Sequence, residues 1–291
     1  MFKIFYAFVW LLTLLPLKVL YVLSDFIYVI VYYIGKYRRK VVRANLTKSF
    51  PEKSLEDIIQ IEKKFYHYFC DLFIETMYQI NMSEKEILKR VKIVNADIIN
   101  DFYLQNKSVM LMTAHYCNWE WLSSLTLSLS HKNSLHNIYK KLKDKSFDQF
   151  MIDLRTKYGA GIIEMQDLFK IMLHKRNEDE LATYGMISDQ RPAAQSIRFW
   201  MTFLNQDTPV FVGTEQLSKK FDYPVVFLAI SRIKRGYYSA EVKLLESEPK
   251  NTAPNEITEK YMRMLEENIK AAPEYWLWTH NRWKYKREII S

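Results

Sequence analysis

Residues 1–35 carry almost no charge and form two apolar stretches, which are separated at Pro16 and Lys18. The second stretch also contains Asp25. Each stretch is shorter than the ~20 apolar residues that a straight membrane-spanning helix needs. No small-residue cleavage site follows, so the pattern fits a secretory signal peptide badly. It favours a membrane anchor or a hairpin that lies in the membrane plane; a helix buried against the rest of the protein is the alternative.

A basic cluster follows directly, at Lys36, Arg38, Arg39, Lys40 and Arg43. Basic residues beside an apolar segment favour the cytoplasmic side of a membrane, where the lipid surface is negatively charged. We therefore divide the chain into an N-terminal membrane-associating helical segment with its basic flank, residues 1–43, and one folded domain, residues 44–291.

The rest of the chain predicts an α/β fold. Residues 54–80 have the period of an amphipathic helix, and Ser54 with Asp57 forms a capping box at its start. After residue 100, helical stretches such as "SFDQFMIDLRTKY", which ends before Gly159, alternate with short apolar runs. The runs of strand length are "SVMLMTA", "LHNIY", "AGIIEM", "ELATYGMI", "TPVFV", "PVVFLAI" and "YYSAEVKLL". This alternation predicts a mixed sheet flanked by helices.

Composition narrows the choice of partners. Hydrophobic residues make up 49% of the chain and charged residues 26%, as in ordinary globular proteins. The net charge of +9 favours anionic partners, such as a membrane surface, a phosphorylated substrate or an acidic protein. No zinc-finger spacing or RNA-binding aromatic motif is present, so nucleic acid is not expected. Cys70 and Cys117 provide neither a disulfide framework nor a metal site, which indicates reduced, cytosol-facing chemistry.

The densest group of reactive residues is "TAHYCNWEW", residues 113–121, directly after the apolar run "SVMLM". A buried strand there would place His115 at its carboxyl end. Asn118 can cap the next helix, which puts Glu120 in the first turn. If His115 lies in the turn before that helix, Glu120 can accept a hydrogen bond from one imidazole nitrogen and leave the other nitrogen basic.

From these residues alone, three interpretations stay open. His115 is a general base served by Glu120, or it forms a nucleophilic pair with Cys117, or it is a structural histidine. The second interpretation requires a base only two residues from its nucleophile, whereas such pairs are normally distant in sequence.

"HYCNWEW" resembles the H-x4-D/E motif of the glycerolipid acyltransferase superfamily, and its Asn-Trp-Glu ending is typical of the lipid A acyltransferases. Other stretches are similar in the same order: "VVRANLTKSFPEKS", "IYKKLKDKSFDQFMIDLRTKYG", "SDQRP", "TPVFVGTEQLSKKFDYPVV" and "APEYWLWTHNRWK". By this resemblance His115 is the general base and Glu120 its partner. Arg155 matches an arginine of the family, and Asp189 matches an aspartate.

The resemblance implies a glycerolipid-acyltransferase-like fold and the transfer of a fatty acyl group to a hydroxyl of a lipid A precursor. It implies an acyl thioester donor, acyl-carrier protein or acyl-CoA, with neither cofactor nor metal ion. The oxyanion would be bound by helix-start N–H groups or by the Asn118 amide. Arg155 would bind a phosphate or carboxylate, or hold a structural ion pair. Asp189 would orient a substrate hydroxyl or brace Arg155.

Two alternatives have the same sequence features. One is an acyltransferase for another acceptor, such as a related anionic glycolipid, an aminolipid or a lysophospholipid. The other is a non-catalytic lipid-binding protein on the same fold. In each case we expect contact with inner-membrane lipids, with the folded domain facing the cytoplasm.

Overall fold

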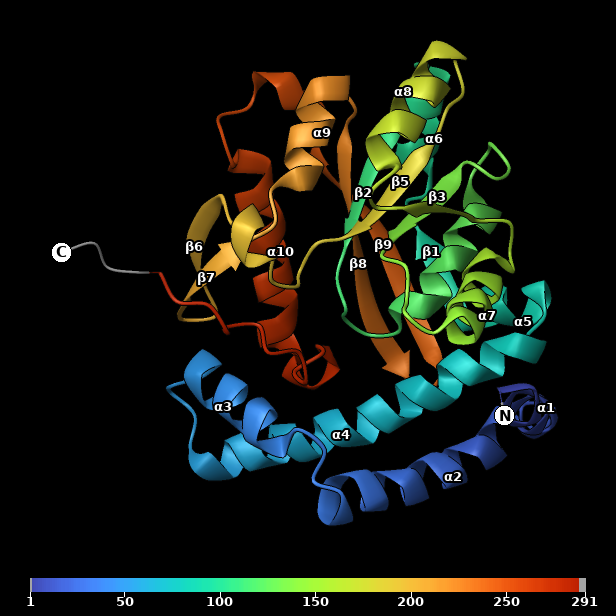
Figure 1. Cartoon of the computed structure of the whole chain (residues 1–291), viewed down its shortest axis with the longest axis vertical. Helices are drawn as coiled ribbons and strands as arrows, with labels where there is room; N and C mark the ends of the chain where they lie inside the picture. The colour runs from blue at the N-terminus through green and yellow to red at the C-terminus, as the bar shows by residue number, and fades with distance from the viewer. Residues whose placement is uncertain (1, 288–291) are drawn as a thin grey trace.

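A seven-stranded mixed sheet runs through the centre of the molecule, with helices packed around it (Figure 1). The computed structural model describes residues 2–287, so the outer ends of the two predicted segments, residues 1 and 288–291, lie outside the described residues. The strand order is β1-β9-β8-β2-β5-β3-β4. Strands β1 and β9 run antiparallel to the other five. The predicted fold class is therefore confirmed.

The strands of this sheet are β1 (Val91–Val94), β2 (Val109–Thr113), β3 (Leu135–Tyr139), β4 (Gly161–Glu164), β5 (Thr183–Ile187), β8 (Val225–Lys234) and β9 (Tyr237–Glu246). A separate antiparallel hairpin consists of β6 (Phe199–Phe203) and β7 (Gln206–Val210). The sequence did not predict β1 or β6, and it placed the strand corresponding to β7 two residues too late.

The α-helices are α1 (Phe2–Leu12), α2 (Leu17–Val29), α3 (Arg39–Ser49), α4 (Leu55–Tyr78), α5 (Glu84–Arg90), α6 (Asp97–Leu104), α7 (Lys145–Thr156), α8 (Leu168–Asn177), α9 (Gly213–Phe221) and α10 (Glu256–Ala271). A π-helical turn, Ile30–Ile34, extends α2. Short 3₁₀ helices are η2 (Gln79–Asn81), η3 (Trp119–Ser128), η4 (Ala194–Ser196), η5 (Pro249–Asn251) and η6 (Pro273–Tyr275). The predicted capping box of Ser54 and Asp57 begins α4.

Strand β2 lies at the heart of the sheet, between β8 and β5, and is parallel to both. All five of its residues are buried. A strand with neighbours on both edges and helices over both faces has no wet side, which explains the unbroken apolar run of its sequence. The register pairs the last residue of β2, Thr113, with the last residue of β5, Ile187. The segments that follow β2 and β5 therefore leave the sheet side by side, at the carboxyl ends of these two strands.

Helix α2 lies along α4 at one end of the molecule (Figure 1). Leu17, Leu20 and Tyr21 are buried in the same core as the central sheet. Polar contacts also hold α2 in place: the Tyr21 hydroxyl donates to Glu75 at 2.7 Å, and the Ser24 hydroxyl donates to Asp71 at 2.8 Å. One face of α2 is thus an integral part of the folded domain.

The opposite face of α2 is apolar and exposed. Val22 and Phe26 on α2 keep 69% and 62% of their surface accessible, and Ile34 in the π-helical turn keeps 73%. Among the described residues, Leu17–Ile34 is the single helical stretch long and apolar enough to cross a membrane, with a mean hydropathy of 1.7 and 28% of it buried. Length and composition alone do not separate a spanning helix from a core helix. One face of this segment is buried against the domain, as the core-helix interpretation expects. The other face is exposed and apolar, as the membrane-anchor interpretation expects.

Candidate active site

His115 and Asp189 meet at the edge of the sheet where β2 and β5 end. His115 lies two residues after Thr113, and Asp189 lies two residues after Ile187. Because adjacent parallel strands in matched register end side by side, the two short extensions bring the side chains together. The Nδ1 atom of His115 is 2.8 Å from Oδ1 of Asp189, and the backbone N–H of His115 donates to the same oxygen at 3.1 Å.

These contacts assign the two imidazole nitrogens different roles. The Asp189 carboxylate only accepts, so Nδ1 carries the proton and donates it. Nε2 is then unprotonated, and it lies 3.3 Å from the amide nitrogen of Gln190, which can donate to it. The His115 side chain is 21% exposed, whereas Asp189 behind it is 2% exposed. The basic nitrogen thus faces the open side, and the carboxylate fixes the tautomer from within.

The C-terminal segment holds this pair in place. The indole N–H of Trp276 donates to the second Asp189 oxygen at 2.8 Å. The backbone N–H of Leu277 donates to the His115 carbonyl at 3.1 Å. Burial opposes ionisation of Asp189, but the charge and hydrogen bonds of His115 and the Trp276 hydrogen bond outweigh it and lower the pKa of this carboxyl group. Trp276 was within a stretch that the resemblance singled out, yet no pattern marked it as a partner of Asp189.

The prediction that Glu120 accepts a hydrogen bond from His115 is wrong, because the Glu120 carboxylate binds other residues. In the described part of the chain, both Glu120 oxygens accept from Arg155, with Nε to Oε2 at 2.8 Å and Nη2 to Oε1 at 2.7 Å. The indole N–H of Trp119 also donates to Glu120 at 3.1 Å. Arg155 reaches Glu120 from the last turn of α7. Asp189 therefore does not brace Arg155, because that arginine is already paired with the other carboxylate.

The Glu120–Arg155 pair is still next to His115. The rings of Trp119 and His115 are 5.0 Å apart and nearly perpendicular. All four side chains line one cavity. Burial tends to lower the pKa of Arg155, but its hydrogen bonds with Glu120 and the charge of that carboxylate raise it overall. Of the two outcomes expected for Arg155, the structural ion pair is the one present, because its partner is Glu120 of the same chain.

Asn118 does cap the following helix, since its side-chain oxygen accepts from the N–H of Trp121 at 3.2 Å. That helix is 3₁₀ rather than α. The proposal of its amide as an oxyanion donor is not supported, because the amide nitrogen donates to Glu75 at 2.7 Å and Asn118 is 1% exposed. Glu75 also accepts from Tyr21 and Tyr238. Asn118 is thus bound in a buried network, and neither it nor Glu75 lines the cavity.

Cys117 is fully buried and has a left-handed backbone conformation, with φ at +50°. Its backbone N–H donates to the Tyr275 carbonyl at 3.0 Å. Burial raises the pKa of the thiol well above its usual value, so the reactive thiolate is strongly disfavoured. As expected, the thiol turns toward packing and not toward a substrate.

The cavity in front of His115 has a volume of about 590 Å³. Its polar lining includes His115, Glu120, Arg155 and Gln190. Its apolar wall includes Leu111, Leu122, Leu125, Met186, Phe211 and Leu228. A cavity lined by a few polar groups and many apolar side chains suits a ligand that has a reactive head and a hydrocarbon chain.

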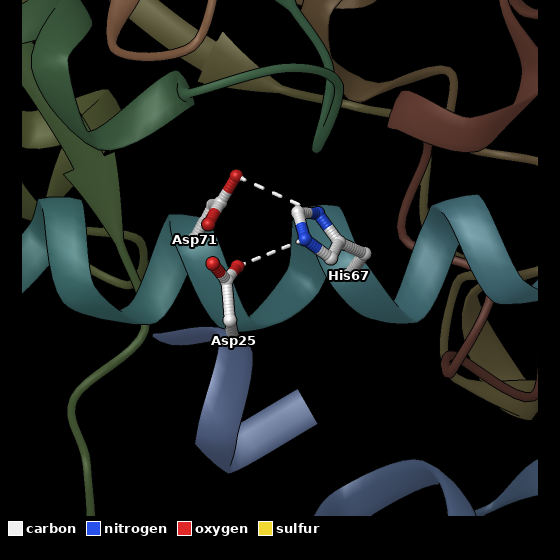
Figure 2. Close-up of side chains that lie close together, drawn as sticks. All are labelled: Asp25, His67 and Asp71. Atoms are coloured by element: carbon white, nitrogen blue, oxygen red, sulfur yellow. Dashed lines mark ion pairs between the residues drawn. The ribbon is translucent and has the colours of Figure 1, made fainter. Parts of the chain in front are cut away.

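One group of three side chains in the described residues has the spacing of metal ligands, namely Asp25, His67 and Asp71 (Figure 2). His67 Nε2 is 2.9 Å from Asp25 Oδ1. Arg235 already binds both carboxylates, with Nη2 at 2.6 Å from Asp71 and 2.5 Å from Asp25. A cation would have to displace this guanidinium, so these residues do not fit a metal ion. The group instead joins α2 and α4 to the turn between β8 and β9.

Comparison with known proteins decides what this site belongs to. Residues 1–285 match the family model of the bacterial lipid A biosynthesis acyltransferases. The chain belongs to this family. It is 23% identical over 284 residues to the lipid A biosynthesis lauroyltransferase of Escherichia coli (strain K12). This alignment covers 97% of this chain and 90% of that protein. It is 21% identical over 277 residues to the lipid A biosynthesis palmitoleoyltransferase of the same organism, covering 94% and 88%.

The lipid A biosynthesis acyltransferase of Shigella flexneri has the same identity and coverage as the palmitoleoyltransferase. These relatives confirm the resemblance and make the chain an acyltransferase of the lipid A type. The interpretation as a non-catalytic lipid-binding protein is therefore set aside. The match extends through the N-terminal helices, in agreement with the way α2 packs into the acyltransferase core.

Proposed function

We propose that this acyltransferase moves a fatty acyl group from an acyl thioester, preferably acyl-carrier protein, directly to a hydroxyl of a lipid A precursor. The observation that carries the proposal is the geometry of His115. Its Nδ1–H is bound by a buried carboxylate, and its Nε2 faces a cavity with an apolar wall. An imidazole held in this way is a general base for an alcohol, which is almost unionised at neutral pH.

In the proposed reaction, Nε2 takes the proton of the acceptor hydroxyl while the hydroxyl oxygen attacks the thioester carbonyl carbon. The carbonyl π electrons move to oxygen and form a tetrahedral oxyanion. The C–S bond then breaks, the ester forms, and the leaving thiolate takes the proton from the imidazolium. Asp189 stabilises that imidazolium through Nδ1–H, as carboxylates do in other histidine-dependent acyl transfers.

Gln190 is our candidate for stabilising the oxyanion. Its amide lies 3.3 Å from Nε2 and must leave that position when the acceptor hydroxyl enters. Because it lines the same cavity, its N–H donors can then reach the oxyanion from the new position. The Glu120–Arg155 pair would position an anionic part of a substrate, because a guanidinium binds phosphate as readily as carboxylate.

The basic stretch 140–145, "KKLKDK", supports acyl-carrier protein as the donor. Lys140 and Leu142 both line the catalytic cavity. A lysine-rich patch at the mouth would attract an acidic carrier protein and let its attached chain enter the cavity. Acyl-CoA, whose phosphates are also anionic, is the second candidate donor.

We also propose that the protein lies on the inner membrane with the apolar face of α1 and α2 in the lipid and the folded domain in the cytoplasm. Ile4 and Phe8 extend the exposed apolar surface onto α1. The contacts of Tyr21, Ser24 and Asp25 tie α2 to the domain, which supports an in-plane helix over a spanning one.

Acyl transfer with the purified protein tests the function. The protein would be incubated with acyl-carrier protein thioester and a lipid A precursor, with a lysophospholipid and an aminolipid as rival acceptors. We expect one new ester on the lipid A precursor, and no acyl adduct on Cys117 in intact-mass measurement. Preferred acylation of a rival acceptor would overturn the assigned substrate, and an adduct on Cys117 would overturn direct transfer.

A further inference from the structure

A second pocket lies between α2, α4, β8 and η6, with a volume of about 440 Å³. It shares no lining residue with the catalytic cavity. Its walls are formed by the side chains of Tyr28, Lys63, Lys64, His67, Arg232, Glu274 and Tyr275. We refer to this site as the basic pocket.

Cations dominate the basic pocket. Lys63 and Lys64 come from α4, and neither forms an ion pair within the described part of the chain. Arg232 enters from β8; its Nη2 binds Asp71 at 3.1 Å, and its Nε is buried with no hydrogen-bond partner there. Glu274 is the one carboxylate in the lining. The pocket therefore has cationic charge in excess of the anionic charge that it contains.

The nearby acidic residues do not cancel this excess. Asp25 and Asp71 carry two negative charges, which Arg235 and Arg232 balance together. Lys63 and Lys64 are then left against Glu274 alone, so an excess of positive charge stays in the pocket. His67 points into the same group, with Nε2 on Asp25 (Figure 2). Asp25 and Asp71 are already paired, whereas Lys63 and Lys64 are not. The pocket can therefore bind an added anion.

The position of the pocket indicates which anion. Tyr28 is part of its wall, and it lies on α2 between Phe26 and Val29, which are 62% and 46% exposed. If the apolar face of α2 lies in the lipid, the basic pocket opens at the depth of the phosphate groups. Tyrosine rings suit that depth, since they have an apolar body and a polar tip.

We propose that the basic pocket binds the phosphate of an anionic lipid headgroup. The proposal rests on the membrane association proposed above. The phosphate would lie between Lys63, Lys64 and Arg232, and the acyl chains of the same lipid would run along the exposed face of α2. The site is separate from the one that binds the acyl donor and the reacting hydroxyl.

The test compares the full-length K63Q/K64Q variant with the wild type and with K132Q/K170Q, which loses the same charge. Lys132 and Lys170 are exposed and lie outside both pockets. Binding is measured by flotation with vesicles of phosphatidylcholine alone, and of phosphatidylcholine with phosphatidate at about four to one. A further arm measures inorganic phosphate binding to each protein without vesicles.

We expect phosphatidate to strengthen the binding of the wild type and of K132Q/K170Q. The affinity of the K63Q/K64Q variant for the phosphatidate vesicles should be roughly tenfold lower than that of the wild type, because each lysine near an anionic surface adds to the binding free energy. Its binding to phosphatidylcholine alone should not change. Equal losses in the two variants would overturn the proposal, as would Lys63- and Lys64-dependent binding of inorganic phosphate as tight as that of the lipid.

Membrane association and acyl transfer are read separately in the same experiment. If the wild type fails to bind either kind of vesicle, the membrane proposal itself fails. If it binds both equally, only the basic pocket is refuted. The acyl-transfer activity of detergent-solubilised K63Q/K64Q should match that of the wild type, because neither lysine lines the catalytic cavity.

Discussion

His115 and Asp189 each lie two residues beyond the paired ends of two adjacent parallel strands, and their side chains meet at 2.8 Å. The separation of 74 positions in sequence does not matter once the register of β2 and β5 is set. The carboxylate is buried and the imidazole is partly exposed. This arrangement makes the base accessible to a substrate while its orientation is fixed from inside the domain.

Asp189→Asn should lower kcat by about 10²- to 10⁴-fold with little change in KM. An asparagine amide can donate to Nδ1, which would move the imidazole proton to Nε2 and remove the base. Steady-state kinetics with the acyl-carrier protein thioester would measure this. Asp101→Asn, on an exposed side of α6, is the control and should behave as the wild type. A kcat for Asp189→Asn within a few-fold of the wild type would show that the histidine does not depend on this carboxylate.

Glu120→Gln and Arg155→Met should each lower kcat/KM, by about tenfold or more, because each leaves a poorly compensated charge at the cavity rim. The double variant should cost much less than the sum of the single losses, since the two side chains bind each other bidentately. A double-mutant cycle in kcat/KM measures this coupling. Fully additive losses would instead favour an independent action of Glu120 on His115, as the sequence first indicated.

Val22→Ser with Phe26→Ser should release the protein from vesicles and leave its unfolding midpoint almost unchanged, because both side chains are on the exposed face of α2. Leu104→Ser is a control, since Leu104 is 82% exposed on α6. Deletion of residues 1–35 is a poorer test, as it also removes Leu17, Leu20 and Tyr32 from the core. If the double variant still floats with vesicles, the membrane contact lies elsewhere.

Acid should destabilise the protein between about pH 6.5 and pH 4. Burial, aided by the charge of Lys175, lowers the pKa of His136 to about 4, and burial also lowers the pKa of His280 to about 4. In the unfolded chain each imidazole binds a proton near pH 6.5. The unfolded state therefore binds more protons than the folded state in this window. The free energy of unfolding is highest above about pH 6.5 and falls as the pH drops toward about 4.

His136→Leu should remove part of this acid sensitivity, because leucine has a similar volume and no proton to bind. Each pKa unit corresponds to about 1.4 kcal/mol at most, and the partial exposure of the ring reduces that figure. Unfolding midpoints at pH 7 and pH 4.5 measure the difference. An unchanged gap between the two midpoints would mean that His136 is not one of the groups responsible.

The local features of the site were predictable, and its longer-range partners were not. An unbroken apolar run followed by a turn placed His115 at a strand end, and Asn118 was recognised as a cap. The partner of His115 depends on which strand lies beside β2, and no spacing within "TAHYCNWEW" contains that information. Glu120 was assigned to His115 from the local turn pattern and from the resemblance to the H-x4-D/E motif, whereas in the fold its carboxylate binds Arg155 at the end of α7.

The missed strands have equally specific causes. Strand β1 has only four residues and follows α5 directly, so its sequence "VKIV" reads as the end of that helix. The β6–β7 hairpin turns at Leu204 and Asn205, which both have positive φ angles, +48° and +59°. Such a two-residue turn is normally signalled by Asn-Gly or Asp-Gly, and leucine in its first position removes the signal.

The most direct test of the account is the activity of a folded His115→Gln variant. Glutamine fills a similar space and can still hydrogen-bond with Asp189, but it cannot take a proton from the acceptor. Transfer of the acyl group from acyl-carrier protein to a lipid A precursor would be measured by mass spectrometry of the product, beside the wild type at equal membrane binding and equal unfolding midpoint. The account predicts a loss of at least about 10²-fold in kcat. Turnover within a few-fold of the wild type would contradict it, because the base would then be another group.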